Sequence, residues 1–172
     1  MSKLSDFLGG IKVVEKVFSS INGKIEVVRS FAFGTYIQVG GLTQTGGVVN
    51  DVWNTSLKKI RNSKLEIRNC LILGLGGGGN AGIVRKFWPG AKIIGVDLDP
   101  KMVEMGRKYF GLDSLEIEIE IDDARDFLKS QISNHKSFDL VLVDLYIGDK
   151  YPDRFETENY IRLVRTVLAR CV

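Results

Sequence analysis

The sequence predicts an α/β fold in which a doubly wound parallel sheet follows a small antiparallel β-hairpin unit. From residue 70 onward, short apolar runs alternate with segments of helical spacing in the order β-α-β-α-β-α-β-α. Right-handed crossovers between such strands produce a parallel sheet covered by helices. Residues 11–45 instead carry short alternating segments separated by glycine turns, which is typical of hairpins. We therefore expect a β-hairpin subdomain over residues 1–47 and a Rossmann-like ligand-binding domain over residues 48–172.

Turn residues place the elements of the N-terminal part. Residues 3–10 predict a short helix that two glycines end. Asn22-Gly23 is a strong short-range hairpin signal, and the alternating segments 24–29 and 35–39 predict strands after it. We expect two to four antiparallel strands here. The apolar spacing of residues 48–60 then predicts a helix that leads into the second part.

The stretch from Cys70 to Pro100 organises the second part. An apolar run at 71–73 is followed by six glycines within nine residues, a short helical segment and a second apolar run that ends on Asp97. The order strand, glycine turn, helix, strand and acid is typical of nucleotide-binding βαβ units. Glycine lets the backbone turn sharply and approach a ligand, and Asn80 is a candidate cap for the helix that follows. A carboxylate about 20 residues beyond the glycines suits the hydroxyls of a ribose. The predicted ligand-binding residues are Gly74, Gly76, Gly77, Gly78 and Asp97.

The glycine pattern leaves several ligands open. It lacks the G-K-[ST] of a triphosphate-binding loop, and it reads G-x-G-G-G-G-N where dinucleotide sites usually read G-x-G-x-x-G. An adenosine-type ligand without phosphates, such as S-adenosylmethionine, fits the glycines and Asp97 equally well. NAD is not excluded by this stretch, and a glycine-rich turn that binds nothing is the structural alternative.

The later elements are placed by caps and by alternation. Asp99-Pro100 predicts the start of a helix that runs to about Tyr109, and acids at 122–123 open a further helix. The strict alternation of LEIEIEI over residues 115–121 predicts an edge strand with one wet face. Residues 138–143 predict a buried strand that ends on Asp144, and a final helix begins at Phe155 or Thr157.

Acids follow three of the predicted strands, at Asp97, Asp122/Asp123 and Asp144. Ligands in open parallel sheets bind beyond the carboxyl ends of the strands. We therefore expect these acids to converge on the glycine loop. Each also has a plainer role available: a strand-end carboxylate for Asp97 and Asp144, and a helix N-cap for Asp123.

The bulk composition excludes several classes of protein. The chain has 24 basic and 21 acidic residues, and a net charge of +3 is too mild to indicate nucleic acid or an anionic membrane as a partner. It shows neither an 18-residue apolar span nor a signal-peptide pattern, so we expect a cytoplasmic protein. Two cysteines without a C-x-x-C motif and a single histidine, His135 in a polar stretch, predict no metal site.

On these motifs, the chain resembles the spermidine synthase (polyamine aminopropyltransferase) family, a branch of the class I S-adenosylmethionine-dependent methyltransferase fold. The resemblance covers most of residues 13–170 and includes LILGLGGGG, the strand-end LVLVD and the segment G-G-L-T-Q at 40–44. It implies S-adenosylmethionine or its decarboxylated form as the donor. It also implies that Asp97 binds the ribose, Asp123 meets the adenine amino group, Gln44 lies over the ligand and Asp144 is catalytic.

The chain departs from this family at three places. A glycine near Gly77 replaces an acid that helps to hold the aminopropyl end of the donor, and Trp53 stands for the family's active-site tyrosine, followed by Asn54. After Asp144, the second family acid is absent from its expected place, and Asp149 is the candidate substitute. The family fold also continues with three more strands. We therefore expect either a fragment or an exposed edge at strand 138–144 that a second subunit covers in a homodimer or larger assembly.

The motifs and the resemblance leave two main classes of function. The first is a transferase that moves an aminopropyl or methyl group from an S-adenosyl donor to a small amine-type acceptor, with Asp144 as general base. The second is a non-catalytic nucleotide-binding or scaffolding protein that keeps the fold. An NAD-dependent oxidoreductase is a weaker third hypothesis.

Overall fold

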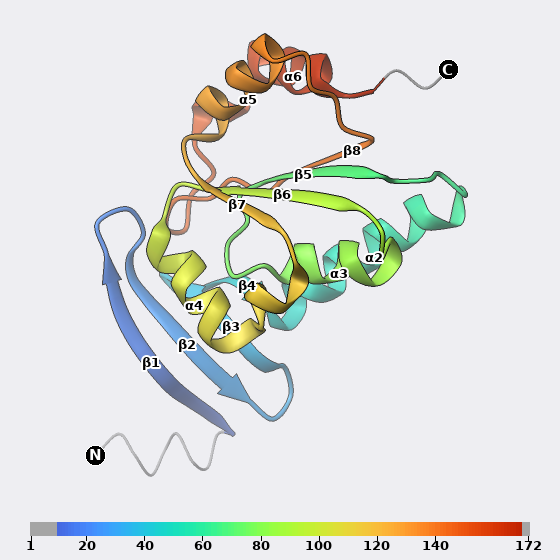
Figure 1. Cartoon of the computed structure of the whole chain (residues 1–172). Coiled ribbons are helices and arrows are strands. Elements are labelled where there is room, and N and C mark those ends of the chain that lie inside the picture. Colours follow the sequence, from blue (N-terminus) through green and yellow to red (C-terminus); the bar gives the residue numbers. More distant parts are fainter. Residues whose placement is uncertain (1–9, 170–172) are drawn as a thin grey trace.

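The structure of the protein is a computed structural model that describes residues 10–169, and it contains two four-stranded sheets (Figure 1). The helix predicted for residues 3–10 lies outside the described residues except for Gly10. Within residues 10–169, no helix has the length and apolarity that a membrane span requires.

The N-terminal sheet is an antiparallel meander, as the hairpin signals predicted. Its strands run in the order β1-β2-β3-β4, and each is hydrogen-bonded to the next. Asn22-Gly23 forms the turn between the first two strands, with Gly23 at φ 69°. The four strands are β1 (Ile11–Ser19), β2 (Gly23–Ser30), β3 (Gly34–Val39) and β4 (Leu42–Gly46).

The second sheet is parallel throughout, in the order β7-β6-β5-β8. The predicted edge position of the LEIEIEI segment is confirmed, but the prediction of a strand from residue 115 is wrong. Leu112–Leu115 forms the 3-10 helix η1, and Glu116 adopts a left-handed conformation at φ 52° that delays the strand. The strands are β5 (Asn69–Leu73), β6 (Lys92–Asp97), β7 (Glu118–Ile121) and β8 (Leu140–Val143).

Helices cover both faces of the parallel sheet, which confirms the doubly wound α/β fold (Figure 1). Leu57 of α2 and Val84 of α3 pack with Ile72 of β5 on one face. Leu128 of α5 and Val167 of α6 pack with Leu71 on the other. The helices are α2 (Gly47–Asn62), α3 (Gly79–Phe87), α4 (Pro100–Phe110), α5 (Ala124–Ser133) and α6 (Glu158–Val167), with a second 3-10 helix, η2, at Asp153–Phe155.

Helix α4 joins the two sheets. Met102 and Met105 are buried on its inner face, against Ile25 and Ile37 of the N-terminal sheet. Figure 1 shows α4 between the antiparallel meander and the parallel sheet. This apolar contact therefore fixes the antiparallel sheet to the unit that contains the parallel sheet. The antiparallel sheet lies beyond the carboxyl ends of the parallel strands.

The predicted cap at Asp99 is confirmed, and of the two predicted starts of the last helix the one at Thr157 is confirmed. Asp99 caps α4 by accepting a hydrogen bond from Lys101 N, Pro100 occupies the first turn, and Thr157 caps α6. The prediction that Asn80 caps α3 is wrong. Gly78 occupies the cap position in a left-handed conformation at φ 84°, and Asn80 lies inside the helix, where its side chain accepts from Ala81 N.

Two helical glycines offer a matched test of this packing. In α4, a Cβ added to Gly106 would lie 2.8 Å from Gly77 O and 2.9 Å from Gly77 Cα, whereas one added to Gly82 in α3 would meet nothing within 4 Å. We expect Gly106→Ala to lower the free energy of unfolding by about 1–3 kcal/mol through overpacking. Gly82→Ala should raise it by about 0.5–1 kcal/mol through helix propensity. Urea titration of both variants measures the difference. Equal free energies of unfolding would show that Gly106 of α4 is not closely packed against Gly77 of the glycine loop.

Candidate active site

A cleft opens at the carboxyl ends of the parallel strands, between the two sheets. Its lining includes Asn22, Gln44, Gly74, Asp97 and Asp144. Strands β5, β6 and β7 progress in one direction across the sheet, whereas β8 pairs on the opposite side of β5. This reversal of strand order lies at the cleft, and open α/β sheets bind ligands at such points.

The glycine loop leads from β5 into α3 and requires its glycines for close contacts. Gly74 has φ 87°, and a Cβ there would overlap the carbonyl oxygen of Asp144 on the neighbouring strand. Gly77 N donates to Thr45 Oγ1 at 2.8 Å, and a Cβ at Gly77 would lie 2.8 Å from Ile37 Cδ1. The loop is therefore held between β8 and the N-terminal sheet, with Gly74 and Gly76 on the wall of the cleft.

Asp97 ends β6 beside this loop, as the spacing predicted. Its carboxylate accepts hydrogen bonds from Gly76 N at 2.6 Å and from Asp99 N at 2.8 Å. Burial raises the pKa of Asp97 to about 6, and the two backbone hydrogen bonds offset only part of that effect. At neutral pH the group is therefore an oriented carboxylate with acceptor capacity remaining, which is the chemistry that a pair of ribose hydroxyls requires.

The raised pKa of Asp97 predicts a pH dependence of stability. Between its ordinary pKa of 3.8 and about 6, the folded state binds the proton more tightly than the unfolded state does. Stability from this group is therefore greatest at low pH and falls as the pH rises through that window, by about 1–3 kcal/mol. Asp97→Asn should remove this component. Urea unfolding of both proteins at pH 4, 5, 6 and 7 measures the difference, and parallel stability profiles would contradict the assignment.

Asp144 follows β8 on the opposite side of the glycine loop. Its Oδ2 accepts a hydrogen bond from Trp53 Nε1 at 3.0 Å, from helix α2. Burial raises the pKa of Asp144 above its usual range, and the Trp53 hydrogen bond opposes that rise. Trp53 is thus more than the packing residue that sequence reasoning favoured, because its indole orients the carboxylate of the candidate base.

The Trp53 hydrogen bond can be removed with little loss of aromatic area. We expect Trp53→Phe to raise the pKa of Asp144 further, by the equivalent of about 1–2 kcal/mol, because a hydrogen bond to the charged form is lost. Carbon-13 NMR titration of the aspartate carboxyl groups measures this pKa. Trp88→Phe is the matched control, since Trp88 Nε1 donates to Leu65 O instead. An unchanged Asp144 titration in Trp53→Phe would exclude the orienting role.

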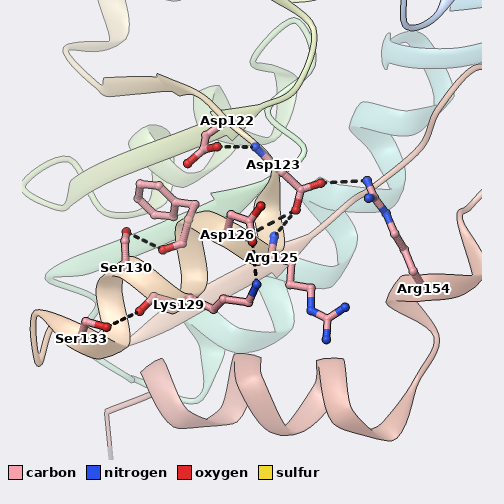
Figure 2. Close-up of polar contacts among 9 residues, drawn as sticks. Asp122, Asp123, Arg125, Asp126, Lys129, Ser130, Ser133 and Arg154 are labelled. Carbon is pink, nitrogen blue, oxygen red and sulfur yellow. Dashed lines mark hydrogen bonds and ion pairs between the residues drawn. The ribbon is translucent and has the colours of Figure 1, made fainter.

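Asp123 stands at the start of α5, and Figure 2 shows its contacts. Its Oδ1 accepts from Arg125 N at 2.9 Å and from Asp126 N at 3.4 Å, so the N-cap alternative is realised. Its Oδ2 accepts from Arg154 Nη2 at 2.8 Å. Asp123 also lines the cleft, so a residue that caps α5 contributes to the cleft wall.

Gln44 lies in the cleft but contacts the loop that follows β8. Its Nε2 donates to Gly148 O at 2.9 Å, while Gly148 N donates to Asn22 Oδ1 at 2.8 Å. Asn22 Nδ2 also donates to the buried Asp99 at 2.7 Å. The loop 145–152 is therefore fastened to the N-terminal sheet.

Asp149, the candidate substitute for the missing family acid, is exposed and does not belong to the described residues that line the cleft.

Sequence reasoning missed three residues of this site: Asn22, Thr45 and Arg154. Asn22 was explained as a turn residue, which is consistent with its local pattern, and no role was predicted for Thr45. Their hydrogen bonds join residues far apart in the chain, which no local signal encodes. Within residues 10–169, no group of three or more histidine, cysteine, aspartate or glutamate side chains is arranged to hold a metal ion.

The glycine loop, the acid at the end of β6 and the parallel sheet covered by helices are typical of the class I methyltransferase fold. A family model described as "Methyltransferase domain" matches residues 70–170. The chain therefore belongs to the methyltransferase domain family, and its fold is spermidine synthase-like.

Individual relatives agree with this assignment. The chain is 35% identical over 88 residues to an eEF1A lysine and N-terminal methyltransferase homolog of Drosophila melanogaster, covering 50% of the chain and 13% of that protein. It is 28% identical over 97 residues to a probable polyamine aminopropyl transferase of Bifidobacterium longum, covering 56% and 21%. The spermidine synthase structure from Thermotoga maritima superposes with a TM-score of 0.74 at 20% identity, over 91% of this chain and 54% of that one. The chain thus spans only part of each relative.

Proposed function

We propose that the protein is an S-adenosyl-donor-dependent transferase that moves an aminopropyl or methyl group to a small amine-type acceptor. One observation carries this proposal: Asp144, whose partly buried carboxyl group has a raised pKa, lines the same cleft as Gly74 of the glycine loop, and its backbone carbonyl lies directly beside that glycine. The candidate base and the candidate donor site therefore share one cleft. The relatives' names support both kinds of transfer, since one is a methyltransferase homolog and another a probable aminopropyl transferase.

The proposed roles follow the geometry of the cleft. Gly74 and Gly76 form the backbone surface against which the donor lies, and Asp97 accepts from the ribose hydroxyls. Gly77 and Gly78, predicted as ligand-binding residues, are buried against Ile37 and Leu112 and support this surface from behind. Asp123 accepts from the adenine amino group, and Gln44 closes the cleft from the N-terminal sheet. The amine nitrogen of the acceptor attacks the carbon next to the sulfonium, and the carbon–sulfur bond breaks. Asp144 takes the proton that the amine loses, while in-line placement supplies much of the rate.

The surroundings of Gly77 bear on which group is transferred. A decarboxylated donor ends in an ammonium, which a desolvated site must pair with a carboxylate. A side chain at Gly77 would meet Ile37 Cδ1 at 2.8 Å and Thr45 Cγ2 at 2.9 Å, so this position has no room for the acid that the spermidine synthase family carries. Within the proposed transfer, this observation favours a methyl group over an aminopropyl group.

Side-by-side calorimetric titration separates these candidates. The ligands are S-adenosylmethionine, its decarboxylated form, methylthioadenosine and NAD. Tighter binding of the decarboxylated donor supports aminopropyl transfer, and tighter binding of S-adenosylmethionine supports methyl transfer. Preference for NAD would replace the proposal with an oxidoreductase. If no ligand binds, the glycine loop has a structural role and the scaffold alternative holds.

Asp144→Asn distinguishes an enzyme from a binding protein. Asparagine retains an oxygen that can accept from Trp53 but cannot act as a base at neutral pH. We expect donor affinity to stay within about twofold and turnover with an amine acceptor to fall by about 10²–10⁴-fold. Asp113→Asn, at an exposed acid that pairs with Arg107, is the matched control. Equal turnover in both variants would remove Asp144 from the mechanism.

We also infer that the protein acts in the cytoplasm and self-associates. Among residues 10–169, strand β8 pairs with β5 on one side only, apart from an isolated bridge between Phe138 and Leu168. Unpaired strand edges favour association with another strand, which supports a homodimer or a larger homo-oligomer.

A further inference from the structure

We propose that Arg154 is a latch on Asp123, and that an adenosine-containing ligand must displace it to reach that carboxylate. The inference rests on the proposed function, because it concerns the adenine end of the same cleft. Figure 2 shows Arg154 reaching from the segment before α6 to Asp123 at the start of α5. The relevant distance is 2.8 Å between Arg154 Nη2 and Asp123 Oδ2.

Of the two carboxylate oxygens of Asp123, only Oδ2 is free of backbone hydrogen bonds and available to a ligand. Oδ1 is engaged by two backbone N–H groups of α5, those of Arg125 and Asp126, which the helix needs for its first turn. Oδ2 is the oxygen to which Arg154 donates. A ligand amino group that binds Asp123 therefore competes with the guanidinium of Arg154 rather than with the helix.

The position of Arg154 is set by the segment that crosses the cleft. This segment, residues 145–154, is fastened at one side by Asn22 and Gln44 through Gly148, and at the other by the Arg154 ion pair. The guanidinium carbon also lies 4.6 Å from the centroid of the Phe155 ring, which is buried. If the ion pair between Arg154 and Asp123 opens, the part of the cleft beside Asp123 is uncovered, while the hydrogen bonds of Gly148 stay in place.

A buried hydroxyl next to the latch lacks a partner in the closed arrangement. The ring of Tyr160 packs on Phe155 at a centroid distance of 4.8 Å, and its hydroxyl is buried without a hydrogen bond to any of residues 10–169. The charges of both Asp123 and Arg154 act on this group. Buried hydroxyls are normally paired, so the closed arrangement leaves one polar group unsatisfied.

The exposure of the ion pair limits the size of the effect. The side chain of Arg154 is 48% exposed and that of Asp123 is 20% exposed. Half-exposed ion pairs are weak and are screened by salt. We therefore expect the latch to reduce ligand affinity by only about two- to fivefold at low ionic strength.

Calorimetric titration of the full chain with S-adenosylhomocysteine tests the latch, because this probe carries the adenosine without reacting. Arg154→Gln should bind it about two- to fivefold more tightly than the wild type at low salt, and the gain should shrink at about 0.5 M salt. Arg154→Lys, which keeps the charge but loses the guanidinium fork, should lie between them. Arg162→Gln is the matched control, since Arg162 pairs with Glu158 on the exposed side of α6, and it should match the wild type.

The outcomes separate the latch from the proposed function. Binding by Arg154→Gln alone, with no binding by the wild type, supports the latch in its strongest form. If the wild type binds and both Arg154 variants bind equally or more weakly, Arg154 supports the ligand instead and the latch is excluded, while the proposed function stands. If neither the wild type nor the variants bind, the donor site itself is refuted and the latch falls with it.

Discussion

The contact between the glycine loop and its surroundings is the constraint on which the rest of the structure depends. Four elements meet at this loop: β8 at Gly74, the N-terminal sheet at Gly77, α2 at Gly79 and α4 through Gly106. None of these approaches leaves room for a Cβ on the glycine concerned. Glycine is usually discussed for its freedom to turn, but here the missing side chains matter as much as the backbone angles. The loop can support a ligand because the surrounding elements hold it in one position.

The aspartates that surround the cleft differ in their hydrogen-bond partners and in their burial. Asp97 and Asp144 are both desolvated, yet Asp97 is satisfied by backbone N–H groups and Asp144 by a single indole. Asp99 is buried and fully committed to the helix cap and to Asn22. Asp123 is shared between a helix cap and an arginine. Four aspartates of one cleft therefore differ in how their oxygens are engaged, because each has different hydrogen-bond donors around it.

Local sequence patterns predicted the elements of this fold better than the contacts between them. The parallel sheet, its flanking helices, the edge strand and the caps at Asp99 and Thr157 all follow from periodicity and cap residues within short windows. The failures occurred where a local pattern competed with tertiary packing. LEIEIEI alternates from residue 115, but Leu112 and Leu115 pack in the core beside α3 and delay the strand. Asn80 resembled a cap, yet Gly78 alone fits the left-handed backbone at that position.

For the candidate site, too, the sequence predicted the positions of residues but not their side-chain contacts. The positions of Asp97, Asp123 and Asp144 follow from the rule that parallel strands end at one edge. The hydrogen bonds of Asn22, Trp53 and Arg154 do not follow from any such rule, because each depends on how the two sheets and the segment before α6 are placed in space. Asn22 illustrates the difference. Its local context predicts a turn, which is correct, and says nothing of the buried acid that its side chain also meets.

The amide of Asn22 has a consequence for how the protein folds. It joins residues that are 77 and 126 positions away along the chain, at Asp99 and Gly148. Contacts of such sequence separation form late, because closing a long loop costs entropy before the contact is gained. The hairpins of the N-terminal sheet can assemble from local contacts, whereas the parallel sheet also needs the pairing of β5 with β8, whose partners Cys70 and Leu140 are 70 positions apart. We therefore expect the cleft to form late in folding, because its walls come from both sheets and from the segment that follows β8.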